Sequence, residues 1–401
     1  MNMTATLTFL GVAALVAMAS SSADLDALRS GSAKFSQDLF SVLREGKENE
    51  NMVASPISLQ IALAMLYAGA QGNTKTQLTS VLHVDTDDLQ KYLGAYKELL
   101  ETIKDPVLSV ASTVFVNLSL NLLDNYTTAV STGFGANVEK VDFKQPDVAA
   151  KTINDWCDTH TNGKIKDLFS AGDLALAEAV LANAVYFKAQ WKTKFNPELT
   201  KERDFKSPTG IVKVQMMNVK SNFKYAFSEK LNAQVLELPY ANDKFRMLVI
   251  LPSEGVALKD VESNVKTIGL DEVMKTMYST EVDVFLPRFK IEMTHDLNAA
   301  LQKLGAADIF SQQANLSGMS DTPLFVSQVK QKVFIEVNEE GTEAAAVTAS
   351  RIQKRSLSFP EIFAADRPFC FVLSSTKKPH SVVFVGALHS PGKSSGTHDE
   401  L

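Results

Sequence analysis

The sequence predicts an α+β fold in one large domain, and two patterns support this prediction. Helical patterning dominates the first half of the chain, whereas short runs of strand-forming residues dominate the rest. Helices followed by many strands are typical of α+β proteins with large sheets. With 401 residues, 45% of them hydrophobic, the chain can bury a large core, and no repeat or linker divides residues from about 25 to 391.

The clearest helix is expected directly after Ser55-Pro56, which resembles an N-cap followed by proline at the first helical position. Residues 57–66 are apolar nearly all round, as in a helix buried in a core, and Gly69 and Gly72 mark its end. Strands are predicted at residues 235–238, 245–251, 282–286, 333–337, 369–373 and 382–385.

The N-terminus is predicted to be a secretory signal peptide, residues 1–19. Residues 6–16 form an apolar stretch too short to span a bilayer, and Ala17-Met18-Ala19 provides a small-residue cleavage site. The segment lacks the usual Lys or Arg before the apolar stretch, and the alternative is a buried N-terminal helix. No later segment is long and uncharged enough to cross a membrane, so no membrane insertion is expected.

Composition and motifs argue against several functions. The net charge of -6 comes from interspersed acids and bases, so no basic stripe is available for nucleic acid or anionic lipid. The six histidines lack a second ligand at metal-binding spacing, and no glycine-rich phosphate loop or nucleophile elbow is present. We therefore expect no metal, no other cofactor and no enzymatic activity, although a single sequence leaves open a catalytic triad assembled from distant residues.

Two cysteines and three sequons bear on the compartment. We expect Cys157 and Cys370 to be buried free thiols, because one disulfide would not staple a chain of this length. Asn117, Asn125 and Asn315 begin sequons and are candidate N-glycosylation sites if they face solvent.

Residues 339–360 differ from the rest of the chain. The segment after Gly341 is small and nearly featureless, and it then becomes basic at Arg351, Lys354 and Arg355. Its plainest interpretation is an exposed linker that trypsin-like proteases happen to cut.

The alternation of side chains favours a different interpretation. If the segment became a strand, successive side chains would point to opposite faces of the sheet. One face would then be uncharged, and it would consist of Thr342, Ala344, Ala346, Thr348, Ser350 and Ile352. Glu343 and Arg351 would lie on the opposite face. The pattern therefore predicts a loop that can become a strand with one side in a packed interior.

Several stretches, in this order, resemble motifs of the serpin family, and the match runs from roughly Ala33 to Pro391. They are Asn183-Ala184-Val185-Tyr186-Phe187-Lys188-Ala189-Gln190-Trp191, Leu286-Pro287-Arg288-Phe289, the hinge from Glu339 to Ala346, Asp366-Arg367-Pro368-Phe369 and Phe384-Val385-Gly386. The resemblance implies one domain over residues 20–391, with helices packed around three β-sheets and an exposed reactive-centre loop at about residues 339–360.

The resemblance also implies a mechanism. The scissile bond of serpins lies a fixed distance beyond the hinge glycine, which corresponds here to Arg355-Ser356. The serine of a target protease would attack the Arg355 carbonyl to form an acyl ester, and the freed loop would insert into the central sheet and distort the protease. The hinge would consist of Gly341, Thr342, Glu343, Ala344, Ala345 and Ala346.

The resemblance further implies where the sheet must open for insertion. The corresponding residues are Ser55, Ser58, Asn183, Trp191 and Gln331, for which core packing and helix capping are the alternative roles. The family often has a His where this chain has Gln331. Because an amide cannot become charged, we do not expect pH-dependent gating at this position.

The basic residues of the loop indicate the class of target. Arg355 favours a protease with an acidic specificity pocket, such as a trypsin-like enzyme. Lys354 makes the site dibasic, as in sites cut by subtilisin-type proprotein convertases. The furin-type signature is incomplete, because Ile352 stands where it requires Arg and Arg351 lies one place further off.

The C-terminal tail, residues 392–401, indicates the compartment. It ends in His398-Asp399-Glu400-Leu401, which matches an address read by the ER-retrieval receptor. Together with the signal peptide it predicts residence in the ER lumen and early secretory pathway, with or without partial secretion. This location favours convertases as targets over secreted trypsin-like proteases. We expect a monomer.

A non-inhibitory ER chaperone or carrier is the alternative function. Some ER-resident serpin relatives act as chaperones for clients such as procollagen, and their hinges tend to lose the run of small residues. This chain keeps the run from Ala344 to Ala346, which favours inhibition.

Overall fold

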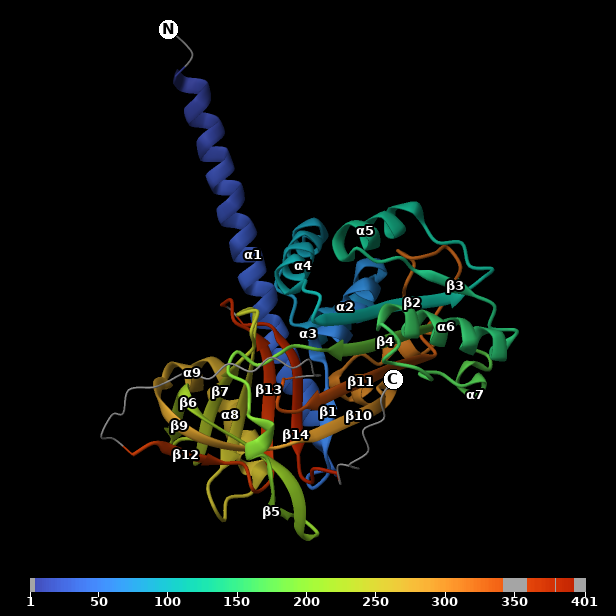
Figure 1. The fold of residues 1–401 in the computed structure, drawn as a ribbon. Helices are drawn as coiled ribbons and strands as arrows, with labels where there is room; N and C mark the ends of the chain where they lie inside the picture. The colour runs from blue at the N-terminus through green and yellow to red at the C-terminus, as the bar shows by residue number, and fades with distance from the viewer. Residues whose placement is uncertain (1–3, 342–358, 379, 393–401) are drawn as a thin grey trace.

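The computed structural model describes residues 4–341, 359–378 and 380–392, with side chains described from residue 23 onward. The helices are α1 (Thr4–Arg44), α2 (Pro56–Gly69), α3 (Gly72–Leu82), α4 (Leu89–Ile103), α5 (Asp124–Phe134), α6 (Pro146–His160), α7 (Ala171–Leu174), α8 (Leu258–Ile268), α9 (Leu270–Lys275) and α10 (Asn298–Leu304), with 3₁₀ turns η1 (Pro197–Leu199) and η2 (Asp308–Phe310). Most helices before residue 180 gather on one side of the molecule in Figure 1.

All six strands predicted from the sequence are present. The strands are β1 (Met52–Ala54), β2 (Leu108–Asn117), β3 (Glu139–Val141), β4 (Ala179–Phe187), β5 (Lys201–Ser207), β6 (Gly210–Ser228), β7 (Ala233–Pro239), β8 (Phe245–Pro252), β9 (Tyr278–Pro287), β10 (Phe289–Asp296), β11 (Gln328–Val337), β12 (Glu361–Ala364), β13 (Phe369–Ser375) and β14 (Val382–Leu388). The predicted α+β fold is therefore confirmed.

The strands form two hydrogen-bonded sheets within the described ranges, whereas three were expected. The five-stranded sheet has the order β10-β11-β4-β2-β3, and the nine-stranded sheet runs β1-β14-β13-β8-β7-β6-β9-β12 with β5 attached to β6. The larger sheet is continuous because β6 has 19 residues and pairs with β5 at its beginning, with β7 at its end and with β9 between. One long strand thus joins what would otherwise be two sheets.

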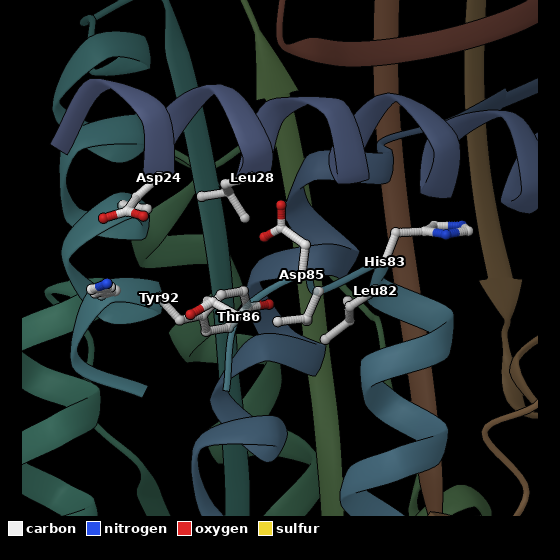
Figure 2. Close-up of a pocket in the computed structure, with 10 residues that line it drawn as sticks. Asp24, Leu28, Leu82, His83, Asp85, Thr86 and Tyr92 are labelled. Atoms are coloured by element: carbon white, nitrogen blue, oxygen red, sulfur yellow. The ribbon is translucent and has the colours of Figure 1, made fainter. Parts of the chain in front are cut away.

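Helix α1 is continuous and includes most of the predicted signal peptide. Its N-terminal part extends away from the body of the molecule (Figure 1). No helix in the described ranges is long and apolar enough to span a bilayer. Where α1 meets the end of α3 and the start of α4, Asp24, Leu28, Leu82 and Tyr92 line a small pocket of about 10 Å³, room for roughly one water (Figure 2). The cleavage site and the domain boundary at residue 20 stay predictions.

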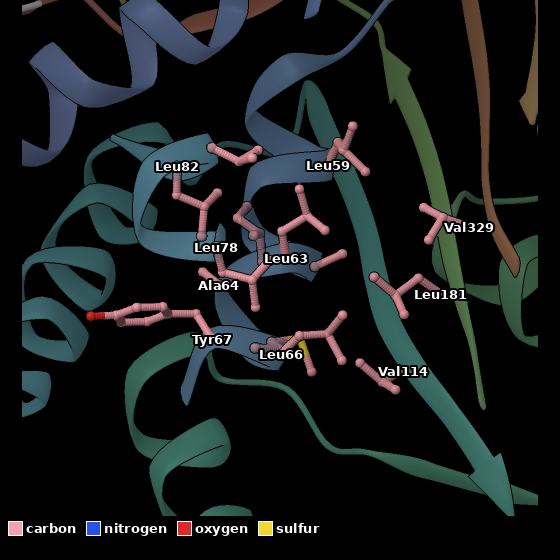
Figure 3. Close-up of a cluster of buried hydrophobic side chains, with 14 of the residues drawn as sticks. Leu59, Leu63, Ala64, Leu66, Tyr67, Leu78, Leu82, Val114, Leu181 and Val329 are labelled. Carbon is pink, nitrogen blue, oxygen red and sulfur yellow. The ribbon is translucent and has the colours of Figure 1, made fainter. Parts of the chain in front are cut away.

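Helix α2 is buried along nearly its whole length, as its apolar sequence predicts. Figure 3 shows Leu63 and Leu66 of α2 beside Val114 of β2 and Leu181 of β4, in a cluster that also contains Val329 of β11. The helix therefore packs on three adjacent strands of the five-stranded sheet. Burial of each leucine side chain contributes roughly 2–3 kcal/mol to the stability of the fold, relative to leaving it exposed.

Strand β4 is buried on both faces, because the five-stranded sheet lies between two layers. On one face, Ala182 and Ala184 pack with Ile153 of α6. On the other, Val185 and Phe187 belong to a core shared with the nine-stranded sheet. A strand inserted beside β4 would therefore meet a packed core on the face that Val185 and Phe187 share with the nine-stranded sheet.

Candidate functional site

The chain reverses direction at the end of β11, in a tight turn from Asn338 to Gly341. The Asn338 N–H donates to the Gly341 carbonyl (3.0 Å), and the Gly341 N–H donates to the Asn338 carbonyl (3.3 Å). Gly341 also forms an antiparallel bridge with Gln190, which follows β4. It therefore lies between the extension of β4 and the extension of β11, antiparallel to both.

The turn is held in place by the segment that follows β4. The Trp191 indole donates to the Asn338 carbonyl (3.0 Å), and the Trp191 backbone N–H donates to the Glu340 carbonyl (2.9 Å). The Trp191 ring stacks on Tyr240 with centroids 4.4 Å apart. Trp191 thus lies at the end of the sheet next to the hinge, where the resemblance to serpins places it.

Both acidic residues of the turn are paired. The Glu339 carboxylate is buried and accepts from Arg288 Nε (2.6 Å) and from Thr200 Oγ1 (2.5 Å). Glu340 pairs with Lys194 at 2.5 Å. Arg288 lies in a motif identified from the sequence, but its partner could not be inferred there because 51 positions separate the two residues. These pairs fix the start of the loop to the body of the protein.

Gly341 is required by the geometry of the turn. Its φ is +136°, and a Cβ atom built there would lie 2.1 Å from the Ala189 carbonyl oxygen and 2.7 Å from the Trp191 nitrogen. Only glycine accepts this backbone conformation and this close approach. The turn therefore needs glycine at position 341, and the role of Gly341 as the hinge stays a prediction.

Four of the five predicted sheet-opening residues come together, and Ser112 of β2 joins them. We call Ser55, Ser58, Ser112, Asn183 and Gln331 the polar row. Gln331 of β11 accepts from the Ser55 N–H (2.9 Å) and donates to the Ser55 carbonyl (2.9 Å) and to Asn183 Oδ1 (2.6 Å). Asn183 donates to Ser112 Oγ (2.7 Å), which lies 2.9 Å from Ser58 Oγ. The row begins at Ser55, the N-cap residue of α2, and ends at Ser58 within α2.

The polar row follows the register of the sheet. Asn183 pairs with Gln331 on one side and with Ser112 on the other, and Gln331 pairs with His295 of β10. His295 is buried and bonds the Val53 carbonyl through Nε2 (2.7 Å). Burial lowers the pKa of His295 below its ordinary value. Sequence reasoning missed Ser112 and His295, because only their cross-strand partners show their place.

Ser55 corrects one expectation. It occupies the N-cap position before Pro56, as predicted, but its side chain caps no N–H of α2. Its hydroxyl instead donates to the Val383 carbonyl of β14 at 2.7 Å. The residue therefore ties the start of α2 to the nine-stranded sheet.

The reactive bond itself lies outside the described residues. This holds for Thr342, Glu343, Ala344, Ala345, Ala346, Arg351, Lys354, Arg355 and Ser356, and for the tail residues His398, Asp399, Glu400 and Leu401. Their assigned roles stay predictions. Across the described ranges, no three His, Cys, Asp or Glu side chains are placed to hold a metal ion.

The predicted glycosylation sites and thiols are placed by the structure. Asn125 and Asn315 are exposed, and Asn117 is partly buried with its Oδ1 bonded to Ser119. Glycan attachment stays a prediction. Cys157 and Cys370 are free and buried, as expected. Burial raises the pKa of both thiols, that of Cys157 to about 12, so both are unreactive at neutral pH.

Comparisons with known proteins agree with this geometry. Residues 30–391 match the model of the family described as serpin (serine protease inhibitor). Leukocyte elastase inhibitor of Sus scrofa is 36% identical over 379 residues, which cover 92% of this chain and 100% of the relative. The structure of Serpin48, from the insect Tenebrio molitor, has 31% identity and a TM-score of 0.82, and covers 90% of this chain and 98% of its own.

Human thyroxine-binding globulin, solved with thyroxine, is also similar, with a TM-score of 0.84 and 28% identity over 92% of this chain and 99% of its own. The family match spans most of the chain, and the relatives are covered almost completely. The chain therefore belongs to the serpin family of serine protease inhibitors, which are not enzymes.

Proposed function

We propose that this chain traps serine proteases that cleave after basic residues, through an acyl ester at Arg355 and insertion of the cut loop between β4 and β11. The observation that carries the proposal is the double pairing of Gly341 with Asn338 and Gln190. Gly341 already occupies the first position of a strand between β4 and β11. Insertion then needs only to continue this strand, residue by residue, from Thr342 onward.

Insertion exchanges one set of strand contacts for two. Strands β4 and β11 are parallel neighbours from Val180↔Gln328 to Tyr186↔Phe334. A loop strand that runs back from Gly341 would be antiparallel to both, so it gains two ladders and loses one, and antiparallel pairing is slightly more stable per residue. Alternation would turn the uncharged face of the loop toward one packed layer. The exchange supplies the free energy that deforms the protease.

The polar row lies across the line along which the sheet must open. The bond from Gln331 Nε2 to Asn183 Oδ1 joins β11 to β4 and must break. Gln331 keeps its two bonds to Ser55, and Asn183 keeps its bond to Ser112. Each strand thus retains polar partners on its own side. We therefore assign to the polar row the role of letting β4 and β11 separate with the loss of one hydrogen bond between their side chains.

The basic residues around the proposed scissile bond determine the target class in this proposal. Leukocyte elastase inhibitor carries an elastase in its name, yet the family's hinge spacing supports Arg355 as the residue before the scissile bond of this chain. A guanidinium is best accepted by an acidic pocket. Lys354, Arg351 and the proposed compartment favour proprotein convertases, with trypsin-like proteases second.

The proposal is tested by mixing the protein, without its signal peptide, with trypsin and with a furin-type convertase. We expect a complex stable in denaturant on gels, and a released peptide that begins at Ser356. Arg355→Ala should abolish the trypsin complex, whereas the matched variant Arg351→Ala should retain it. Complete cleavage with no complex from either protease would reject the inhibitor proposal, and a complex that persists in Arg355→Ala would reject the assigned bond.

We also propose that the protein resides in the ER lumen, because a signal peptide and the tail His398-Asp399-Glu400-Leu401 act together. Deletion of the four tail residues should move most of the protein from the cell to the medium. Sensitivity of the retained form to endoglycosidase H, lost stepwise in Asn125→Gln and Asn315→Gln, would support glycan attachment. Equal secretion with and without the tail would reject retrieval.

A carrier function is the second candidate, and one cavity favours it. A cavity of about 400 Å³ lies among α1, α8 and strands β8, β13 and β14, and Phe40, Ile250, Val372 and Val385 are among its lining residues. The similarity to thyroxine-binding globulin makes thyroxine a suitable probe. Saturable quenching of protein fluorescence by micromolar thyroxine would support a carrier function, and its absence would remove this candidate.

A further inference from the structure

Four large apolar side chains are exposed near one end of the nine-stranded sheet, and we call Phe227, Tyr278, Phe359 and Ile362 the apolar patch. Their exposed fractions are 51%, 54%, 97% and 60%. Among the residues whose side chains the structure describes, no other Phe, Tyr or Trp is exposed. A group of exposed aromatic residues that the core does not use indicates a surface for contact with another protein.

The register of the strands brings the patch together. Tyr278 begins β9 and pairs with Tyr225 of β6, while Phe227 of β6 pairs with Gln234 of β7. Gln234 Nε2 donates to Tyr225 Oη and to the Ile362 carbonyl of β12, at 3.2 Å in each case. The register partner of Phe227 therefore bonds both to the register partner of Tyr278 and to the backbone of Ile362. Figure 1 shows β6, β9 and β12 together at one side of the molecule.

Phe359 adjoins the patch through the chain. It lies three residues before Ile362, and β12 runs parallel to β9 from Glu361 onward. Burial and the nearby Glu361 carboxylate raise the pKa of the Tyr225 phenol, so the start of β12 also lies close to the register partner of Tyr278. The patch thus extends along β12 toward the proposed scissile bond.

The length of chain between Phe359 and that bond identifies the partner. Phe359 follows Arg355 by four residues, which span at most about 14 Å. A globular protease domain of about 220 residues has a radius of gyration of about 17 Å. Its interface with a partner typically buries about 800 Å² on each side, more than a few loop residues provide. A protease bound at the Arg355 carbonyl therefore extends over the surface next to the loop, where Phe359 is the first described residue.

We propose that the apolar patch is a second contact site for the target protease, in which Phe359 and Ile362 pack against an apolar or aromatic surface beside the active site of the protease. Aromatic side chains buried at the centre of an interface contribute much of its binding free energy. This inference rests on the proposed function, which supplies the protease, and it adds a determinant of specificity to Arg355. Among proteases that accept arginine, those with an apolar surface on this side are favoured.

The patch acts on association and not on trapping. In the proposed reaction the serine oxygen of the protease bonds to the Arg355 carbonyl carbon, the peptide bond to Ser356 breaks, and the Ser356 nitrogen leaves as an amine that takes up a proton. Phe359 then remains on the chain that continues into β12, whereas the protease is attached to Arg355. Insertion of the loop separates the two, so contacts at the patch speed association without changing the outcome after cleavage.

Binding to inactive proteases tests the patch by itself. Trypsin and a furin-type convertase, each with its catalytic serine replaced by alanine, are immobilised for surface plasmon resonance with the chain that lacks its signal peptide. We expect Phe359→Ser with Ile362→Ser to weaken binding of the more tightly bound protease at least fivefold, whereas Phe359→Leu with Ile362→Val should retain it. Leu118→Ser with Leu176→Ser, at exposed apolar positions beside the five-stranded sheet, is the matched control and should leave binding unchanged. Unchanged binding in the Phe359 and Ile362 serine variant, or no binding by the unsubstituted chain, would overturn the proposal.

The active proteases separate this proposal from the proposed function. On denaturing gels, the serine variant of Phe359 and Ile362 should form the covalent complex at least fivefold more slowly, with the same ratio of trapped to cleaved protein. An unchanged rate would overturn the contact site. Cleavage of the unsubstituted chain without any complex would reject the inhibitor function alone, because binding to the inactive proteases does not depend on trapping.

Discussion

At the scale of single residues, polar groups buried in the interior constrain this molecule most. Gln331 is fully buried, yet its amide makes three hydrogen bonds, two of them to the backbone of Ser55. A buried polar group stabilises a fold only while its partners remain in place. The polar row therefore stabilises the closed sheet, and opening the sheet costs the free energy of the hydrogen bond that breaks.

We predict that Gln331→Leu destabilises the closed protein. The substitution leaves the Ser55 N–H and Asn183 Oδ1 without a partner, at a total cost of about 3 kcal/mol, whereas the Ser55 carbonyl keeps the Leu59 N–H. The midpoint of denaturant unfolding should fall accordingly, and long incubation should give more polymer on native gels. Gln313→Leu, at an exposed position, is the control. An unchanged midpoint in Gln331→Leu would mean that the row does not hold the sheet closed.

Stability should also fall as the pH is lowered toward 4, partly because of His389. Its pKa is about 4 in the folded protein against an ordinary 6.5, so the unfolded chain binds a proton that the folded protein excludes. The stabilising effect is fully present above pH 6.5 and is lost as the pH falls toward 4. His389→Gln should flatten the midpoint profile between pH 6.5 and 5, where carboxylates contribute least. His160→Gln, at an exposed position, is the control substitution. A midpoint profile in His389→Gln as steep as that of the unsubstituted protein would contradict the role assigned to His389.

At the scale of elements, the sequence predicted segments well and their partners poorly. The helix after Ser55 and the six strands were recognisable because their patterns are local. The bond between Ser55 and Gln331 joins residues 276 positions apart, and nothing local marks Ser112 as its continuation. The continuity of β6 was missed for the same reason, since it depends on three partner strands. The hinge rests on the family spacing, and beyond Gly341 it stays a prediction.

The alternation of loop side chains between the two faces of the proposed strand gives a prediction for two matched variants. Thr342→Arg places a charge on the face that would enter the packed interior, whereas Glu343→Arg places the same charge on the opposite face. Burial of an unpaired charge slows insertion, so Thr342→Arg should be cleaved by trypsin as a substrate, with little covalent complex. Glu343→Arg should still form the complex. Equal complex in both variants, measured on denaturing gels, would contradict the proposed strand.

At the scale of the whole molecule, the five-stranded sheet is one strand short of its most stable form in this account. Insertion of a sixth strand between β4 and β11 adds ladder hydrogen bonds and buries small side chains without a change in composition. In the proposed mechanism, the intact protein is held by a kinetic barrier to which the polar row and the Glu339–Arg288 pair contribute.

Cleavage of the loop should consequently stabilise the protein. We predict that a protease that cuts between Ala346 and Arg355 without being trapped raises the thermal midpoint by at least about 10 °C, since several kcal/mol of new pairing act on the whole domain. Differential scanning calorimetry of cut and intact protein measures the effect. Cleavage between Pro208 and Thr209, in the turn that joins β5 to β6, is the comparison. A midpoint that stays constant or falls after loop cleavage would show that no strand is inserted.

The most direct test of the central claim closes the path between β4 and β11. Ala182 and Lys330 are register partners across this pair, and Ala182→Cys with Lys330→Cys, in a Cys157→Ala background, creates a disulfide that joins the strands. We predict that the oxidised protein is cleaved by trypsin without a covalent complex, and that reduction restores the complex. If the oxidised and reduced forms trap trypsin equally well, the loop does not insert between β4 and β11, and the mechanism proposed for this chain is wrong.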